Sequence, residues 1–249
     1  MGFSDLVSFL TIIPVGGRTI RGAASSSHWL PVMGLLVGVP AGLLGWLVSM
    51  YAGPLAGAAA ALAAACIITG LHHVDGLADF ADGLMARGSR ERRIAAMRDK
   101  ATGAGGAAAV ALCLLLAAAA ASQRSGMDLL VAVVVAEVAA KYSVVVTAAA
   151  GRAAADGGGS LFCEATGAKR LAVATCIWLV PGILTMWLVP GSNLGLLAIL
   201  GAASAAAAAV VVTAVAQNAF GGVTGDVMGA AHEAGRATAM ISVVSAWGI

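Results

Sequence analysis

The sequence predicts an all-α fold: a polytopic integral membrane bundle of six to seven transmembrane helices, forming one membrane-embedded domain over residues 1–249. Hydrophobic residues make up 60% of the chain and charged residues only 10%, and the mean hydropathy is +0.95. Such a composition is typical of chains that cross a membrane several times. The net charge of +2 is too small to favour a nucleic-acid partner. The four cysteines show neither a zinc pattern nor a disulfide framework.

The N-terminal residues predict a short helix lying in the membrane interface. Their apolar side chains recur at i, i+3, i+4 and i+7, at Phe3, Leu6, Val7 and Leu10. The run contains Asp5 and is followed, rather than preceded, by Arg18 and Arg21. This order is the reverse of that in a secretory signal, so we expect no cleavage.

Six apolar stretches are long enough to cross about 30 Å of hydrocarbon. They run approximately over residues 31–50, 54–71, 104–121, 127–150, 170–189 and 194–216. A seventh apolar segment, 237–249, is expected to be either a short span or an inserted half-helix.

Lysine and arginine residues fall almost entirely on one side of this arrangement. The positive-inside rule therefore places the N-terminus in the cytoplasm, together with three loops over residues 72–103, 151–169 and 217–236. The other side receives only Arg124, and Lys141 lies inside a span with Glu137 four residues before it. An unpaired charge there would be costly, so these two residues are expected either to pair structurally or to contact a substrate.

Three carboxylates and two histidines appear together after the second span, in the segment GLHHVDGLADFADG over residues 70–83. In a helix, Asp75, Asp79 and Asp82 are spaced i, i+4 and i+7, within roughly 60° of one another on one face. A hard divalent cation, Mg²⁺ or Mn²⁺, is the usual means of stabilising such a cluster, and it commonly binds substrate phosphates. On the same geometry His72 shares the face of Asp75, whereas His73 points away.

A basic segment follows, SRERRIAAMRDK over residues 89–100. Its arginines either anchor the chain beside anionic headgroups or form a basic wall opposite the acidic cluster. In the second case Arg92, Arg98 and Lys100 would neutralise a phosphate-rich substrate.

Two glycine runs lie near these charged segments. Asp99 comes just before the first, at residues 103–106, and the second, GGVTGD, occupies residues 221–226. Glycines of this kind let backbone N–H groups approach phosphate oxygens, but neither run matches a P-loop. His232 is expected at the periphery, although the preceding loop could bring it to the site.

Together these residues resemble the cobalamin synthase family, adenosylcobinamide-GDP ribazoletransferase. The likeness rests on HVDGLADFADG at 73–83, MRD at 97–99 with its glycine-rich tail, and GGVTGDVMGA at 221–230. The runs FLTIIP at 9–14 and PVMGLLVG at 31–38 are similar too, so the resemblance covers nearly the whole chain. It implies a Mg²⁺-dependent transferase in the cytoplasmic membrane of a prokaryote, with its active face toward the cytoplasm.

The resemblance also implies substrates and site residues. The enzyme would join α-ribazole, or its 5′-phosphate, to adenosylcobinamide-GDP, giving GMP and adenosylcobalamin or its 5′-phosphate. The family motifs map the metal ligands onto Asp75, Asp79, Asp82 and Asp99, with the first three and His73 as catalytic residues. They map further substrate-binding residues onto Gly221, Gly222, Thr224, Gly225 and Asp226. After Asp99 the sequence departs from the family pattern, which tends to have a serine where Lys100 stands.

The resulting hypothesis is that Mg²⁺ bridges the diphosphate while the ribose 3′-hydroxyl attacks the cobinamide phosphate in line. A spare carboxylate or His73 would accept the proton. One alternative is a CDP-alcohol-type phosphotransferase, whose signature differs after Ala78. Another is a cation transporter, which would place its carboxylates near the bilayer midplane. Membrane lipid is the other expected partner, and the oligomeric state stays open.

Overall fold

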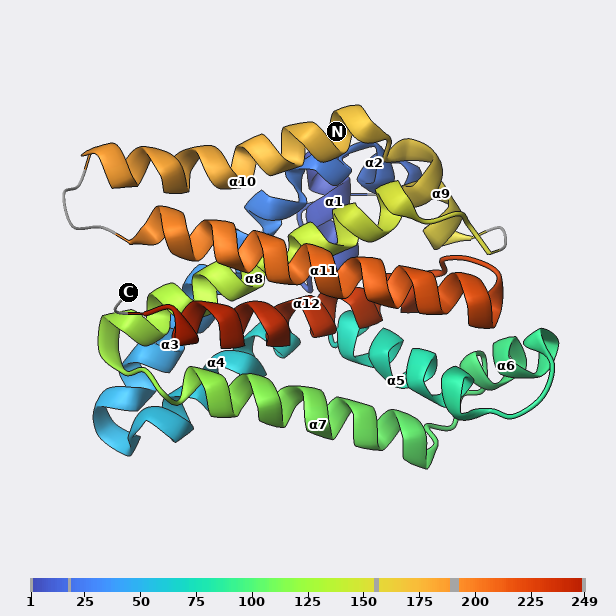
Figure 1. The fold of residues 1–249 in the computed structure, drawn as a ribbon, viewed down its shortest axis with the longest axis horizontal. Helices are drawn as coiled ribbons and strands as arrows, with labels where there is room; N and C mark the ends of the chain where they lie inside the picture. Colours follow the sequence, from blue (N-terminus) through green and yellow to red (C-terminus); the bar gives the residue numbers. More distant parts are fainter. Residues whose placement is uncertain (1, 18, 155–156, 189–192, 248–249) are drawn as a thin grey trace.

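The computed structural model describes residues 2–17, 19–154, 157–188 and 193–247. Over these ranges the chain is almost entirely helical, and its β pairing is limited to an isolated bridge between Ala153 and Val223. The expected all-α class is confirmed. The long helices run side by side along the longest axis of the molecule (Figure 1).

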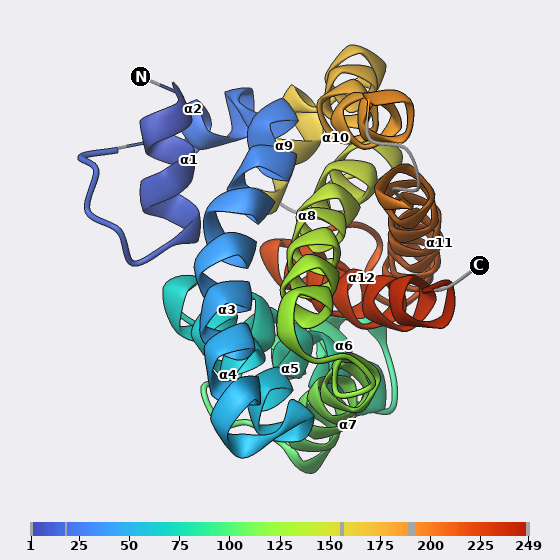
Figure 2. The same cartoon turned by 90° about the vertical axis from the view of Figure 1, so that its left-hand side faces the viewer.

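Long helices form most of the bundle: α3 (Leu30–Ala52), α7 (Ala104–Ala121), α8 (Gly126–Ala150), α10 (Ala168–Leu188), α11 (Leu194–Phe220) and α12 (Gly225–Ser245). The shorter helices are α1 (Gly2–Leu10), α2 (Ile20–Ser25), α4 (Pro54–Ile68), α5 (His72–Met85), α6 (Arg90–Met97) and α9 (Gly158–Ala165), and a 3-10 turn covers Ser27–Trp29. Viewed end-on, α8 lies in the middle of the bundle and packs against α3, α11 and α12 (Figure 2). It is therefore buried over most of its length.

Five helices are long and apolar enough to cross a membrane: Ser27–Ala52, Ala104–Ala121, Gly126–Ala150, Ala168–Thr185 and Leu194–Phe220. A sixth crossing results if α4 and α5, which meet at a 91° bend, form one broken span. The expected polytopic helical membrane protein is confirmed. The expected count is six to seven spans. The described part of the structure has five such helices, and reaches six if α4 and α5 together form one span.

The seventh predicted segment, 237–249, is not a separate span. Its residues up to Ser245 belong to α12, which begins at Gly225, and residues 248–249 lie outside the described part. The predicted loop 217–236 is wrong for the same reason. Polar residues make this stretch look like a loop in the sequence, but the bundle pairs them inside a helix.

The other two predicted loops also contain helices. Segment 72–103 forms α5 and α6, and segment 151–169 contains α9. Arg236, which the sequence places with the basic residues of one side, is only 2% exposed in the core of the bundle. Its charge is balanced by buried glutamates, so Arg236 does not count in the positive-inside rule and gives no information on which end of the bundle faces the cytoplasm.

The break between α4 and α5 turns the chain into the acidic segment. Gly70 and Leu71 both have left-handed backbones, with φ of 61° and 62°. This conformation suits glycine but is strained for leucine. The Leu71 N–H donates to the Cys66 carbonyl at 2.9 Å and closes the end of α4. Helix α5 then begins at His72, before the first aspartate.

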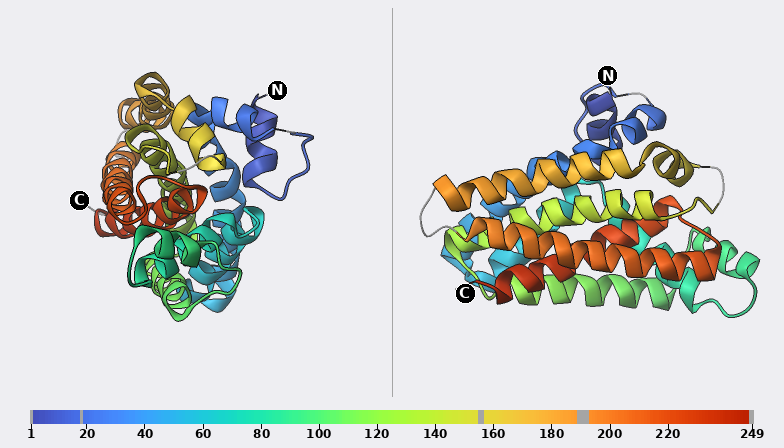
Figure 3. Two further views of the ribbon diagram at one scale, coloured as in Figure 1. Left: turned by 90° about the vertical axis from the view of Figure 1, so that its right-hand side faces the viewer. Right: turned by 45° about the horizontal axis from the view of Figure 1, so that its top comes forward.

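The N-terminal helix α1 is amphipathic, as expected. Leu6, Val7 and Leu10 are buried, while Phe3 is exposed. Helix α2 packs beside it and is capped at its N-terminus by Thr19, whose hydroxyl accepts the Gly22 N–H. Both helices lie on the flank of the bundle (Figure 3). Arg18, which the sequence analysis used, lies outside the described residues.

Candidate active site

The acidic segment lies where α5 crosses α12. The helices touch through glycine: a Cβ on Gly76 would lie 3.0 Å from the Cα of Asp226. A Cβ on Gly229 would lie 3.0 Å from the carbonyl oxygen of His73. Only glycine at both positions permits this approach, which brings the first turn of α12 against the acidic face of α5.

Four carboxylates gather at this crossing. The charges of Asp75, Asp82 and Asp226 all act on Asp79. The three aspartates predicted to share a helix face therefore do so, and Asp226 joins them from another helix. Burial raises the pKa of Asp226, and a hydrogen bond from Thr224 and the charge of Arg98 act in the opposite direction.

Asp82 is held by the start of α7. One carboxylate oxygen accepts the Gly103 N–H at 2.6 Å, and the other accepts the Gly106 N–H at 2.7 Å. A Cβ on either glycine would lie 2.6 Å from a carboxylate oxygen of Asp82. The first glycine run therefore binds a carboxylate of the protein itself at a helix N-terminus.

Asp99, the fourth predicted metal ligand, bonds to the backbone of the turn that follows it. It is exposed, its side chain accepts the Ala101 N–H at 3.0 Å, and it follows the C-terminus of α6. Asp99 thus shapes the turn into α7 in this structure.

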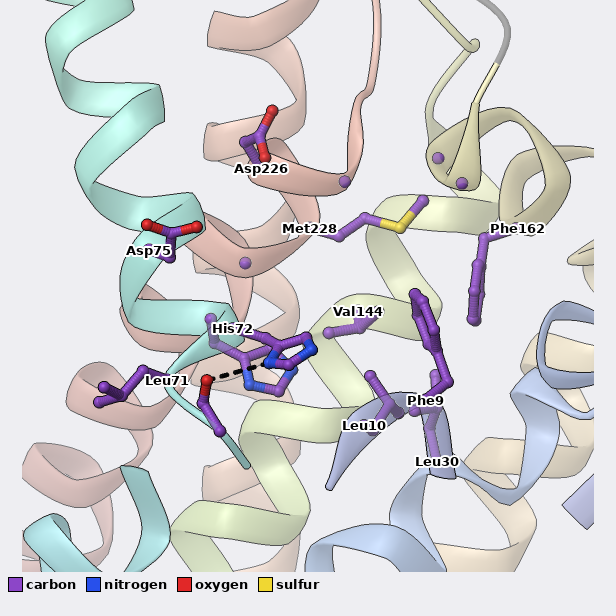
Figure 4. A pocket seen from close by; sticks show the side chains of 16 residues that line it. Phe9, Leu10, Leu30, Leu71, His72, Asp75, Val144, Phe162, Asp226 and Met228 are labelled. Atoms are coloured by element: carbon purple, nitrogen blue, oxygen red, sulfur yellow. Dashed lines mark hydrogen bonds between the residues drawn. The ribbon is translucent and has the colours of Figure 1, made fainter. Parts of the chain in front are cut away.

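A cavity of about 530 Å³ opens beside the carboxylates. Asp75 and Asp226 lie at one end, and the rings of Phe9 and Phe162 lie at the opposite end (Figure 4). His72 is exposed and reaches into the cavity, where its Nδ1 lies 3.1 Å from the Gly70 carbonyl oxygen. The cavity therefore joins an acidic end to an aromatic end.

The second glycine run forms the turn into α12. Gly221 has a left-handed φ of 83°, and Gly222 packs too closely on the backbone at Arg152 for a side chain to fit. The Val223 N–H donates to the Arg152 carbonyl at 2.7 Å. The turn is thus fixed to the segment that follows α8.

Thr224 caps α12 and orients Asp226. Its hydroxyl oxygen accepts the Val227 N–H at 3.4 Å, and the hydroxyl donates to Asp226 Oδ2 at 3.2 Å. Of the predicted substrate-binding residues in this run, Gly225 and Asp226 line the cavity, whereas Gly221, Gly222 and Thr224 shape the turn.

The predicted basic wall is exposed on and after α6. Arg92, Arg98 and Lys100 are all exposed, and the charge of Arg98 acts on Asp226. Arg90 and Arg93, which the sequence analysis did not single out, line a separate cavity with Asn218. Their i, i+3 spacing on one face of α6 is the signal that could have found them.

His73, predicted as the catalytic histidine, points into the bundle core. It is 5% exposed, and its ring stacks on that of His232 with centroids 3.8 Å apart. Both histidines of the motif line the cavity, but His72 reaches into it, as helical geometry predicts.

A buried polar network lies beneath the stacked rings of His73 and His232, and the sequence predicts only its members Glu137 and Lys141. His232 Nε2 lies 2.6 Å from Lys141 Nζ, and His232 Nδ1 lies 3.1 Å from Glu233 Oε1. Arg236 pairs with Glu233 and, at 3.3 Å, with Glu137. Glu137 and Lys141 are thus each paired to α12 rather than to one another, and the expectation of a peripheral His232 is wrong.

The same network contains three potential metal ligands. Suitable atoms of His73, His232 and Glu233 lie within 4.8 Å of one another. Lys141 and Arg236 already bond to His232 and Glu233, and two cations there balance two glutamates. A divalent cation would have to displace them, so the cluster serves to join α5, α8 and α12.

These features define a polytopic helical membrane protein with carboxylates lining a cavity between its helices. A family model described as cobalamin-5-phosphate synthase matches residues 2–244. The chain belongs to this family.

Similar proteins support the assignment to this family. An adenosylcobinamide-GDP ribazoletransferase of Bradyrhizobium diazoefficiens is 46% identical over 101 residues, covering 39% of this chain and 38% of that protein. Proteins of the same name from Methanocella arvoryzae and Chlorobium phaeobacteroides are 40% identical over 114 residues and 34% identical over 103 residues. These alignments cover 42% and 41% of this chain, and 40% and 42% of the relatives. The chain thus spans about two fifths of the length of each relative. No solved structure matches the chain.

Proposed function

We propose that the protein is an adenosylcobinamide-GDP ribazoletransferase of a prokaryotic cytoplasmic membrane. It would join α-ribazole, or its 5′-phosphate, to adenosylcobinamide-GDP and release GMP. The observation that carries the proposal is the cavity beside Asp75, Asp79 and Asp226 in a chain of this family. Clustered carboxylates beside a cavity suit phosphate chemistry that depends on a divalent cation.

The donor set fits Mg²⁺. Asp75 and Asp79 on α5 and Asp226 on α12 offer hard oxygen ligands, whereas both oxygens of Asp82 accept backbone N–H groups at the start of α7. We assign the metal to these three residues and give Asp82 the role of fixing α5 to α7. When bound, Mg²⁺ would neutralise charge on the diphosphate and on the GMP leaving group.

His72 is the residue that we assign to proton transfer. A carbonyl oxygen can only accept, so the contact with Gly70 requires His72 Nδ1 to be the donor. The neutral ring then keeps a lone pair on Nε2. As the ribose 3′-hydroxyl oxygen bonds to the cobinamide phosphorus, its proton moves to Nε2 and the bond from phosphorus to the GMP oxygen breaks.

Charge distribution supports a cytoplasmic active face. Arg98, exposed just after α6, acts by its charge on Asp226 at the acidic end of the cavity. Arg124, the single basic residue expected on the other side, donates to the Val244 carbonyl at 2.9 Å and so caps α12. This placement satisfies the positive-inside rule.

Activity of the purified protein tests the proposal. Protein in detergent is incubated with adenosylcobinamide-GDP, α-ribazole 5′-phosphate and Mg²⁺, and GMP and the coupled corrinoid are quantified by mass spectrometry. We expect equal amounts of both products from wild type, and about tenfold less of each or lower from Asp79→Asn at the same Mg²⁺ concentration. Asp128→Asn, an exposed aspartate in the first turn of α8, is the matched control and should retain activity. Folded wild-type protein that forms no coupled corrinoid would overturn the proposal.

A further inference from the structure

We propose that the cavity between α1, α5, α8, α9 and α12 binds the nucleoside substrate, with its base at the aromatic end and its ribose at the acidic end. The inference rests on the proposed function and names the part of the reaction that this cavity serves. It also gives the chemical character that the bound base should have: flat, uncharged and largely apolar.

Size is the first argument. The cavity measures about 530 Å³, within the range of clefts that enclose a single drug-sized ligand. A nucleoside phosphate is such a ligand. A corrin macrocycle with its amide side chains is several times larger, so it must stay largely outside.

Wall chemistry is the second argument. The rings of Phe9 and Phe162 stack with centroids 5.9 Å apart and an interplanar angle of 28°. Leu10, Val144 and Met228 continue this apolar surface. Stacked aromatic walls favour a flat aromatic ligand, and aliphatic side chains favour methyl groups on its edge.

The same walls argue against the guanine of the other substrate. Guanine carries several donors and acceptors on its edge, and Phe9, Phe162 and Leu10 offer none in return. Polar groups buried without partners are strongly penalised, and sites discriminate on that basis. The apolar end therefore selects the base of the acceptor nucleoside over that of the GMP leaving group.

Polarity along the cavity orients the ligand. His72, Asp75 and Asp226 stand at the end opposite the two phenylalanines (Figure 4). A base at the aromatic end directs its ribose toward these side chains. The attacking hydroxyl then lies beside the group that we assign to accept its proton.

Phe9→Leu and Phe162→Leu test the assignment because they remove the aromatic faces while keeping apolar bulk. With adenosylcobinamide-GDP saturating, we expect each change to raise KM for α-ribazole about tenfold or more. KM for adenosylcobinamide-GDP, measured at saturating α-ribazole, should stay within about twofold of wild type. Phe3→Leu on the same helix is the control, since Phe3 is exposed and packs on Trp29.

Equilibrium binding of α-ribazole, followed by the fluorescence of its benzimidazole, separates this inference from the proposed function. If Phe162→Leu binds α-ribazole more weakly than wild type does, but wild type releases no GMP, the proposed function is refuted and the binding site is supported. If wild type releases GMP, but both leucine variants raise KM only for adenosylcobinamide-GDP, the binding site is refuted and the proposed function is supported.

Discussion

Gly76 of α5 and Gly229 of α12 are in backbone contact: a Cβ on Gly76 would lie 3.2 Å from the Cα of Gly229. The two helices carry complementary parts of the acidic site, with Asp75 and Asp79 on α5 and Asp226 on α12. Because no side chain stands between the backbones, the carboxylates of both helices approach one another. The width of the candidate metal site is therefore set by this pair of glycines.

Gly76→Ala should widen the site. The added methyl group would meet the Cα of Asp226 at 3.0 Å, so α12 must move away from α5. We expect the rate of GMP release to fall about tenfold or more, with a stability loss of about 1–3 kcal/mol. Both are measured in one detergent, as initial rates and as thermal unfolding. Gly167→Ala, where a Cβ would meet nothing within 4 Å, should behave as wild type. A fully active Gly76→Ala variant would contradict the argument.

Asp79 and Asp82 should respond differently to the same substitution. Asp79→Asn removes a proposed ligand, so the Mg²⁺ concentration for half-maximal activity should rise by about tenfold or more. Asp82→Asn weakens the hydrogen bonds to Gly103 and Gly106, so the free energy of unfolding should fall by about 1–2 kcal/mol. Residual Asp82→Asn activity should keep the Mg²⁺ dependence of wild type.

Magnesium titrations of GMP release and thermal unfolding in the absence of Mg²⁺ distinguish these effects. Asp99→Asn is the third variant, because the family resemblance implies a metal-ligand role for Asp99 whereas its carboxylate here accepts the Ala101 N–H. It should leave the Mg²⁺ dependence unchanged. If Asp99→Asn or Asp82→Asn raises the Mg²⁺ concentration for half-maximal activity as much as Asp79→Asn does, that residue is a metal ligand and our assignment is wrong.

Local features were predictable from the sequence, and contacts between distant segments were not. The shared face of Asp75, Asp79 and Asp82 follows from helical spacing alone, and the membrane bundle follows from apolar runs. The partners of Asp82 lie more than twenty residues further along the chain. No periodicity shows that Gly103 and Gly106 donate to that carboxylate instead of to a substrate phosphate.

Helix α12 was missed because its polar residues look like those of a loop. His232, Glu233 and Arg236 would be costly on a lipid-facing helix, and only the partners on α8 make them acceptable inside the bundle. Glu137 and Lys141 gave a partial signal, since two charges inside a span require partners. The sequence left open whether they pair structurally or contact a substrate, and in the structure each contacts a residue of α12.

Removing one member of a buried ion pair should cost more stability than removing both members of the pair. Arg236→Met leaves Glu137 and Glu233 without their cation, and we expect a loss of about 3–5 kcal/mol. Replacing only Glu137 with leucine in the same chain should recover much of that loss, because Glu233 stays linked to Lys141 through His232 and Glu137 no longer leaves an unpaired charge. Unfolding in mixed micelles, followed by circular dichroism, measures both. Arg87→Met, at an exposed position, is the control. A double variant less stable than Arg236→Met would contradict this account.

The two histidines of the motif should separate into a catalytic and a structural residue. His72→Ala removes the Nε2 that we assign to the ribose proton, so kcat should fall by about 10²–10⁴-fold while KM for both substrates changes little. Imidazole in the buffer should restore part of the rate, because the cavity is open where His72 is exposed. His73→Asn should instead lower thermal stability through loss of the stack on His232, with no rescue by imidazole. Initial rates with and without imidazole, together with unfolding curves for both variants, test the assignment. If His73→Asn is the variant that imidazole rescues, the proton passes to His73, and His72 has another role.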